Sequence, residues 1–209
     1  MSITVTENVV RTIAETAIAN EKYFGDLDAV VGDGDFGYSL ARGFEKLLDG
    51  WDDLNRTDAG SFLKRTGMVI ASRAGGTTGP LWGTAFLRAG AVAGSGGDVV
   101  GMLRAAIEGI KARGRSDVGD KTLLDALVPF TDALEAELGG GTAVPDAIRA
   151  AAAAARAAAD ATAGMVAKRG RASYTGERSR GSADAGAVAV AVIAERISET
   201  WQSHQGATS

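Results

Sequence analysis

Apolar side chains recur every three or four residues along most of the chain, which is the spacing of one face of an α-helix. One such stripe runs through Val9, Ile13 and Ala17 and continues to Tyr23 and Phe24. The pattern predicts helices over residues 9–24, from just after Gly37 to residue 48, over 62–70, from Gly79 to residue 87, over 99–110, over 123–134, from Pro145 to residue 160, and over 186–201.

Two stretches fit this pattern less directly. Alanine fills residues 150–155 and 157–159, and we expect a packed helix there because alanine is the best helix former and permits close helix contact. The run over residues 187–192 alternates like a strand, but the chain offers it no partner strands, and we expect a buried helix. The sequence therefore predicts an all-α fold of eight helices, an antiparallel up-and-down bundle or barrel, in a single domain over residues 1–209.

Composition narrows the class of protein. The chain has 209 residues, 45% of them hydrophobic, which suffices for one continuous core. A net charge of -4 argues against a general nucleic-acid binder. The absence of cysteine excludes disulfides and thiolate metal sites. Neither a signal peptide nor an apolar run near the roughly 20 residues of a membrane span is visible, so we expect a cytoplasmic protein without a membrane partner.

The most informative motif is LDAVVGDGDFG over residues 27–37, which places Asp28, Asp33 and Asp35 among glycines. Three carboxylates so close repel one another unless a cation lies between them. Mg²⁺ prefers oxygen ligands from a few carboxylates and completes its shell with water and substrate phosphates. The motif therefore predicts a metal and phosphate site.

Other interpretations of this motif are weaker. Gly32, Gly34 and Gly37 fit a dinucleotide-binding G-x-G-x-x-G, but carboxylates at the variable positions would repel a bare pyrophosphate. A calcium loop counted from Asp33 would need a bidentate Glu at its twelfth position, which is Phe44. A plain acidic turn without a ligand fits three carboxylates poorly.

Three further loops carry candidate chemistry. Residues 75–79, GGTTG, precede an expected helix, where backbone N–H groups and hydroxyls suit phosphate oxygens. Residues 114–122 resemble a Walker loop, but Asp120 interrupts the Gly-Lys-Thr run and excludes one, and a helix cap is the plain structural role for it. Residues 168–180 carry five basic side chains around Tyr174 and Glu177, which suits a solvated loop, a phosphate clamp or a docking flap.

Four blocks together, LDAVVGDGDFG, GGTTGPLWGTAFLRAG, GDKTLLDAL and GRASYTGERSRGSADAGA, resemble in content and order the nucleotide-binding L subunit (DhaL family) of dihydroxyacetone kinases. The resemblance spans nearly the whole chain. It implies an eight-helix antiparallel barrel with Mg-ADP or Mg-ATP at one end. It also implies phosphoryl transfer to a short ketose, such as dihydroxyacetone, that a separate K subunit holds covalently.

The resemblance also implies site residues. Asp28, Asp33 and Asp35 would hold a pair of Mg²⁺ ions and act in catalysis through them. The residues implied to contact the nucleotide are Phe36, Gly37, Tyr38, Ser39, Thr77, Thr78, Gly114, Leu123, Arg171, Asp184, Ala185 and Gly186. The family usually has His at the position of Phe36 and Pro at the position of Ala185. Because phenylalanine has no polar side-chain atom, a side-chain hydrogen bond from residue 36 is excluded.

Partners and donor stay open at this stage. A K-type subunit is the implied partner, and a phosphocarrier protein that recharges ADP is the alternative to exchangeable ATP. A chain of this kind could also be a non-catalytic, nucleotide-containing partner of a transcriptional regulator, or belong to a fatty-acid kinase system. The only histidine, His204, lies near the C-terminus, where we expect it to be solvated.

Overall fold

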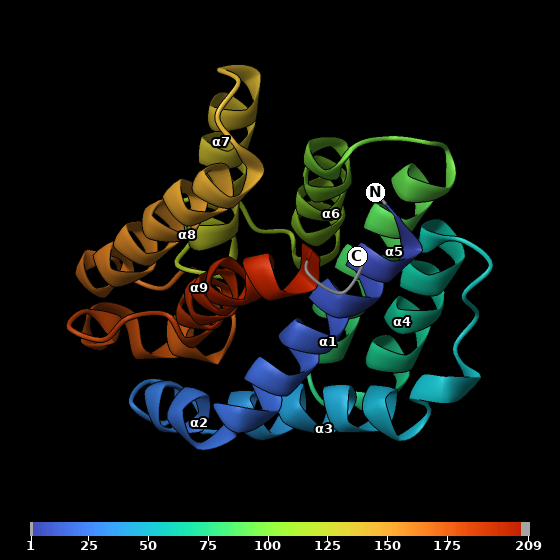
Figure 1. The fold of residues 1–209 in the computed structure, drawn as a ribbon. Coiled ribbons are helices and arrows are strands. Elements are labelled where there is room, and N and C mark those ends of the chain that lie inside the picture. The colour runs from blue at the N-terminus through green and yellow to red at the C-terminus, as the bar shows by residue number, and fades with distance from the viewer. Residues whose placement is uncertain (1, 206–209) are drawn as a thin grey trace. The chain divides into compact units, whose positions relative to one another are not determined.

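The computed structural model describes the backbone of residues 2–205 and the side chains of residues 2–201. Within this part of the chain the structure is all-helical, as predicted (Figure 1). Its α-helices are α1 (Ile3–Ala19), α2 (Glu21–Ala29), α3 (Phe36–Asp49), α4 (Ala59–Arg73), α5 (Thr78–Gly94), α6 (Val99–Gly114), α7 (Leu124–Gly139), α8 (Val144–Ala161) and α9 (Ala185–Gln205). Short 3₁₀ turns are η1 (Trp51–Asp53), η2 (Thr162–Gly164) and η3 (Arg171–Ser179).

The helix count exceeds the prediction because the expected first helix is divided. Asn20 ends α1: its backbone N–H and its side-chain amide both donate to the Thr16 carbonyl, and α2 begins at Glu21. The buried face of α1 also differs from the predicted stripe, since Val10 and Ala14 are fully buried beside Ala17 whereas Val9 and Ile13 are only half-buried.

The chain folds into two compact units. Unit 1 comprises Met1–Glu21 and Gly37–Arg115, and unit 2 comprises Lys22–Phe36 and Ser116–Ser209. The polypeptide crosses between the units three times, so each is built from segments distant in sequence. That the whole chain behaves as a single domain stays a prediction.

In unit 1, α5 packs against both α4 and α6 (Figure 1). Glycines allow α4 and α5 to approach closely: a Cβ on Gly67 would lie 2.7 Å from the Gly83 carbonyl oxygen, and one on Gly90 would lie 2.9 Å from that of Gly60. A side chain at any of these positions would force the helices apart. Residues 74–77, which contain the first part of the GGTTG run, join the two helices, so this close packing fixes both ends of that loop.

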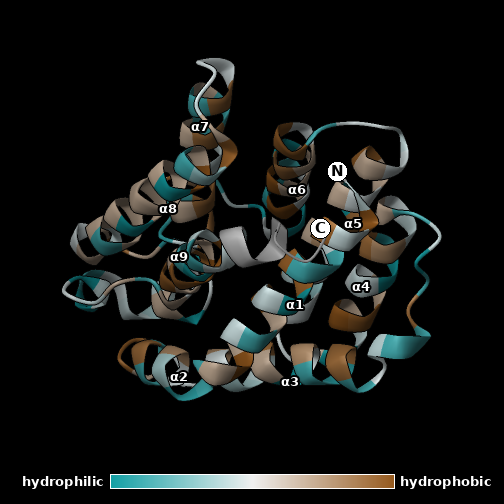
Figure 2. Ribbon diagram, viewed as in Figure 1, coloured by the Kyte–Doolittle hydropathy of each residue, from teal (hydrophilic) through white to brown (hydrophobic). Residues whose placement is uncertain are grey.

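In unit 2, α8 packs between α7 and α9. The alanine-rich tract forms α8, as predicted, and buries Ala147, Ala151 and Ala155, while Figure 2 shows hydrophobic and hydrophilic residues mixed along the helix. Arg156 reaches from α8 to α9 and forms two hydrogen bonds of 2.8 Å with the Glu195 carboxylate. The run over residues 187–192 lies within α9, so the expected buried helix is confirmed.

Not every predicted apolar position is buried. Met68, an apolar residue within the helix predicted over 62–70, is 51% exposed on α4. From residue 2 to residue 205, no helix combines the length and the apolar character that a membrane crossing would require.

Candidate metal and nucleotide site

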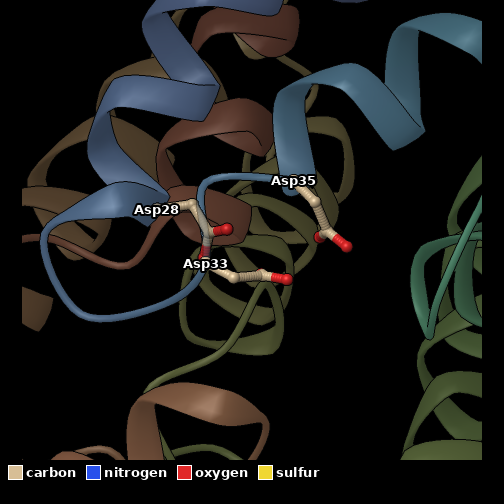
Figure 3. Close-up of side chains that lie close together, drawn as sticks. All are labelled: Asp28, Asp33 and Asp35. Carbon is tan, nitrogen blue, oxygen red and sulfur yellow. The ribbon is translucent and has the colours of Figure 1, made fainter.

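Three carboxylates converge in the acidic loop, which we define as residues 28–36. Asp28 projects from the last turn of α2, Asp33 from the turn that follows, and Asp35 from the residue before α3 (Figure 3). One oxygen from each carboxylate lies within 4.8 Å of the others. The sequence motif thus becomes a cluster in space, as predicted.

The backbone of the loop orients Asp28. The N–H of Phe36 donates to Asp28 Oδ2 at 3.3 Å, and the N–H of Gly32 donates to the Asp28 carbonyl at 2.6 Å. A Cβ on Gly32 would lie 2.9 Å from Asp28 Cγ. A side chain at position 32 would therefore displace the Asp28 carboxylate.

Arg171 of η3 reaches the same cluster from a segment far along the chain. It forms an ion pair with Asp33, and its Nη1 lies 3.1 Å from Asp35 Oδ2. The side chains of Asp33, Asp35 and Arg171 remain 45%, 47% and 55% exposed. The contacts are therefore accessible to a ligand and weak enough to exchange.

This donor set fits a hard divalent cation. The ligand atoms are carboxylate oxygens, which Mg²⁺ prefers, and three negative charges face the single positive charge of Arg171. Exposure of Asp33 and Asp35 leaves room for water or phosphate to complete a coordination shell. An isolated acidic turn would gain nothing from holding three carboxylates so close.

Phe36 stabilises the loop without a polar side chain. Its ring centroid lies 6.3 Å from that of the buried Phe24, and its N–H is the group that contacts Asp28. Residue 36 therefore contributes a backbone donor to this loop, since phenylalanine has no side-chain donor.

The structure brings a further group of predicted residues together in unit 1. Ser39 is buried in the first turns of α3, and a Cβ on Gly75 would lie 2.8 Å from its hydroxyl oxygen. Tyr38 beside it is exposed. Thr77 is exposed and Thr78 is buried at the start of α5, which begins one residue before the predicted Gly79. The hydroxyl of Ser39 and the glycine loop are thus neighbours. The other two predicted site residues of unit 1 are Gly37, in the first turn of α3, and Gly114, the last residue of α6.

In unit 2, Leu123 and the Asp184–Gly186 segment are neighbours. A Cβ on Gly186 would lie 3.4 Å from Leu123 Cβ. Asp184 caps α9 by accepting a 2.8 Å hydrogen bond from the Ala187 N–H, and Ala185 is the first residue of that helix. Burial raises the pKa of the Asp184 carboxyl to about 7, against the opposing effect of the Ala187 N–H.

The basic side chains of residues 168–180 divide into separate roles. Lys168 and Arg169 pair with Asp120 at 3.7 and 3.3 Å, and Arg180 pairs with Glu177, whereas Arg171 reaches the acidic loop. The plain structural role expected for Asp120, a helix cap, is wrong: α7 begins at Leu124, and Asp120 instead binds these cations. The acceptor near the start of α7 is the buried Asp125, which receives N–H bonds from Gly119 and Thr122.

Sequence reasoning missed Lys121, which is 3% exposed and directs its ammonium at backbone carbonyls. The GDKT run over residues 119–122 is the sequence signal for this lysine, although the run does not form a Walker loop. Asp120 pairs with Lys168 and Arg169, Lys121 donates to backbone carbonyls, and the Thr122 N–H donates to Asp125.

These observations define an all-helical protein with a carboxylate metal site on a loop between helices. Residues 30–199 match the family model described as "DAK2 domain", and the chain belongs to this family. It is 37% identical over 181 residues to the protein named "PEP-dependent dihydroxyacetone kinase, ADP-binding subunit DhaL" of Escherichia coli, covering 84% of this chain and 86% of the relative. The resemblance to the DhaL family drawn from the sequence is thus confirmed.

Longer relatives contain the same domain. The chain is 37% identical over 202 residues to the "L-erythrulose kinase" of Pectobacterium atrosepticum, covering 93% of this chain but 34% of that protein. The crystal structure of "the dihydroxyacetone kinase from C. freundii in complex with AMP-PNP and Mg2+" matches with a TM-score of 0.77 and 26% identity, covering 94% of this chain and 34% of that one. This chain therefore spans about a third of the length of these relatives.

Proposed function

We propose that this chain is the nucleotide-binding, phosphoryl-transferring subunit of a kinase for dihydroxyacetone or a related short ketose. The observation that carries the proposal is the convergence of Asp28, Asp33 and Asp35 within 4.8 Å of one another. Support comes from relatives named as ADP-binding subunits and as erythrulose kinase, and from a structural neighbour named as a complex with AMP-PNP and Mg²⁺.

The three aspartates would hold a pair of Mg²⁺ ions together with the phosphates of ADP or ATP. Bound Mg²⁺ offsets phosphate charge and stabilises charge on the transferring phosphoryl group. The protein's own task is to orient these carboxylates, and the Phe36 N–H does so for Asp28. Arg171 is long and exposed enough to exchange its carboxylate partners for a phosphate oxygen.

Other residues are proposed nucleotide contacts on chemical grounds. Ser39, Thr77 and Thr78 offer hydroxyls, and Gly37 and Tyr38 offer backbone N–H groups at the start of α3, where phosphate is favoured. The buried Leu123 and its neighbour Gly186 offer apolar contacts of the kind that suit a nucleoside, with Ala185, Asp184 and Gly114 as the remaining predicted contacts.

The acceptor sugar is proposed to be bound by a separate K-type subunit. The chain's only histidine, His204, falls outside the residues whose side chains are described, so its expected solvation stays untested. A relative named as one subunit of a kinase supports the division of labour. Phosphoryl transfer then depends on the partner to position the sugar hydroxyl.

Native mass spectrometry of the purified chain tests nucleotide binding directly. We expect a complex with ADP and Mg²⁺, and Asp33→Ala should remove the ligand while circular dichroism stays helical. Retained Mg-ADP in the variant contradicts the assignment. Bound ADP that resists exchange with added ATP would identify a phosphocarrier protein as the donor, whereas free exchange would identify ATP.

Activity is tested by adding a K-type subunit and dihydroxyacetone to the loaded chain. We expect ketose phosphate to form only when both proteins are present. Tight nucleotide binding without transfer to dihydroxyacetone or erythrulose, under either donor, would favour the non-catalytic partner of a regulator instead.

A further inference from the structure

Lys121 makes an unusual set of contacts for a lysine. It is almost fully buried, and its backbone takes a left-handed conformation with φ of +62°. Its Nζ donates to the carbonyl oxygens of Met165 at 3.3 Å, of Ser182 at 2.8 Å and of Ser179. These bonds use all three N–H donors of an ammonium group.

All three acceptors lie in one stretch, residues 165–182, which we call the basic segment. Met165 begins it, and Ser179 and Ser182 lie at its other end. One buried cation therefore joins the two ends of the segment. Because both ends are fixed, the loop between them has fewer conformations available. Less conformational entropy is therefore lost when the loop takes a single shape.

Neighbouring contacts strengthen the same junction. The Lys168 N–H donates to the Asp120 carbonyl at 3.0 Å, a backbone contact that does not depend on the exposed Lys168 side chain. Within the segment, the Ala167 N–H donates to the buried Ser179 hydroxyl at 2.8 Å. The ends of the basic segment are thus held, while Tyr174 between them is 90% exposed.

The ammonium form of Lys121 is the one these contacts need. Burial lowers the pKa of Lys121 from its usual range, and the nearby Asp184 carboxylate partly offsets this change. A neutral amine would have two N–H donors for three carbonyl acceptors. One of the three carbonyls would then lose its partner.

Arg171 is the residue of this segment that reaches the acidic loop, through Asp33 and Asp35. We propose that Lys121 is a positioning residue, which pins both ends of the basic segment so that Arg171 is held at the metal and phosphate site. The role in ligand binding rests on the proposed function, whereas the pinning itself does not.

The absence of cysteine from the chain permits a specific chemical test. Lys121→Cys is alkylated in the unfolded state with 2-bromoethylamine, which restores an ammonium on a side chain of lysine length, or with 1-bromopropane, which gives the same shape without the charge. Both proteins are refolded and compared with wild type. Circular dichroism and thermal unfolding confirm the fold of each.

Hydrogen exchange measures the pinning without any ligand. We expect amides of residues 165–182 to exchange at least tenfold faster in the propyl protein than in the aminoethyl protein. Helix α8 should exchange equally in both. Equal protection of the basic segment in the two proteins would overturn the proposal, and faster exchange throughout unit 2 would show a general structural role instead.

Calorimetric titration with Mg-ADP measures the link to Arg171. We expect Lys121→Met and Arg171→Gln each to weaken binding about tenfold, and the double variant to be no weaker than either. Lys168→Met, the same substitution at an exposed ion pair of the segment, should change affinity less than twofold.

Two outcomes separate the proposals. Additive losses in the double variant would overturn the link between Lys121 and Arg171. If the wild-type chain binds no Mg-ADP, the proposed function fails, and the exchange experiment alone then decides whether Lys121 pins the segment.

Discussion

Two loops of unit 2 are both rich in aspartate and glycine, yet they do different things with their carboxylates. In the acidic loop, Asp33 and Asp35 are half-exposed and face one another, with Arg171 as their cationic partner. In residues 117–125, which we call the lysine loop, each carboxylate has its own N–H donors or cationic partners. Asp117 accepts from the Val118 N–H, Asp120 binds two cations, and Asp125 accepts two N–H groups in a buried position.

The two loops have similar compositions, but their carboxylates have different roles. A carboxylate whose acceptor sites are filled by N–H groups holds a loop in shape, and removing its charge costs folding free energy. Carboxylates that converge without enough donors destabilise the loop and gain from a cation. A binding site is therefore identified by carboxylates that lack enough donors from the protein itself, not by the number of aspartates.

The largest expected effect comes from removing one converging carboxylate. Asp33→Asn should weaken Mn²⁺-ADP binding at least 100-fold, because the cluster loses a ligand and a negative charge, while thermal stability stays equal or rises.

Asp125→Asn should instead affect stability and leave Mn²⁺-ADP binding less changed. We expect the free energy of unfolding to fall by about 2 kcal/mol, because two N–H groups lose a charged acceptor. Paramagnetic resonance of Mn²⁺ and chemical denaturation measure the two quantities. Equal effects of both variants on binding would break the contrast.

A matched pair of glycine substitutions should separate the loops in the same way. Gly32→Ala should weaken Mn²⁺ binding about tenfold, because the new methyl group meets the Asp28 carboxylate. Gly119→Ala meets no atom within 4 Å but must adopt φ of +88°. It should cost about 1 kcal/mol of stability and little affinity. The same two measurements apply, and unchanged Mn²⁺ affinity in Gly32→Ala would contradict the steric argument.

Asp184, which faces Lys121 of the lysine loop, should make stability depend on pH. Its pKa of about 7 in the folded protein exceeds the ordinary value of 3.8, so its protonated form stabilises the fold fully below pH 4. This contribution is lost as pH rises through 7. Relative to Asp184→Asn, wild type should lose about 4 kcal/mol of unfolding free energy between pH 4 and pH 8.

Denaturation curves at several pH values check this slope. Asp58, which caps α4, gives a control of opposite sign, because its hydrogen bonds from Ser61 lower its pKa. Its contribution is present above the ordinary pKa and is lost as pH falls below it. Parallel pH profiles for wild type and Asp184→Asn would refute the raised pKa of Asp184.

The smallest effect is expected at Phe36. Phe36→His replaces the ring that packs on Phe24 but keeps the N–H that contacts Asp28. Mn²⁺ affinity at pH 8, where the imidazole is neutral, should therefore change less than threefold. A larger change, seen by the same resonance titration, would show that the side chain at position 36 takes part in the site.

The helical fold and the acidic cluster were predictable because both depend on local sequence. Residues 28–35 are close in sequence, so three carboxylates with glycines between them could hardly avoid one another. The alanine tract of α8 was predictable from propensity alone. The break at Asn20 and the exposure of Met68 were not, because periodicity gives the spacing of a stripe but not the neighbour that covers it.

The sequence by itself determined the helices, the acidic loop and, through the four blocks, the family. Tertiary structure alone decided which charges meet across the chain: Arg171 with Asp33, Lys168 and Arg169 with Asp120, and Lys121 with the carbonyls of residues 165–182. The reason is physical. Local structure follows from the spacing of neighbouring residues, whereas a contact between residues 40 to 140 positions apart depends on how packed helices place their ends.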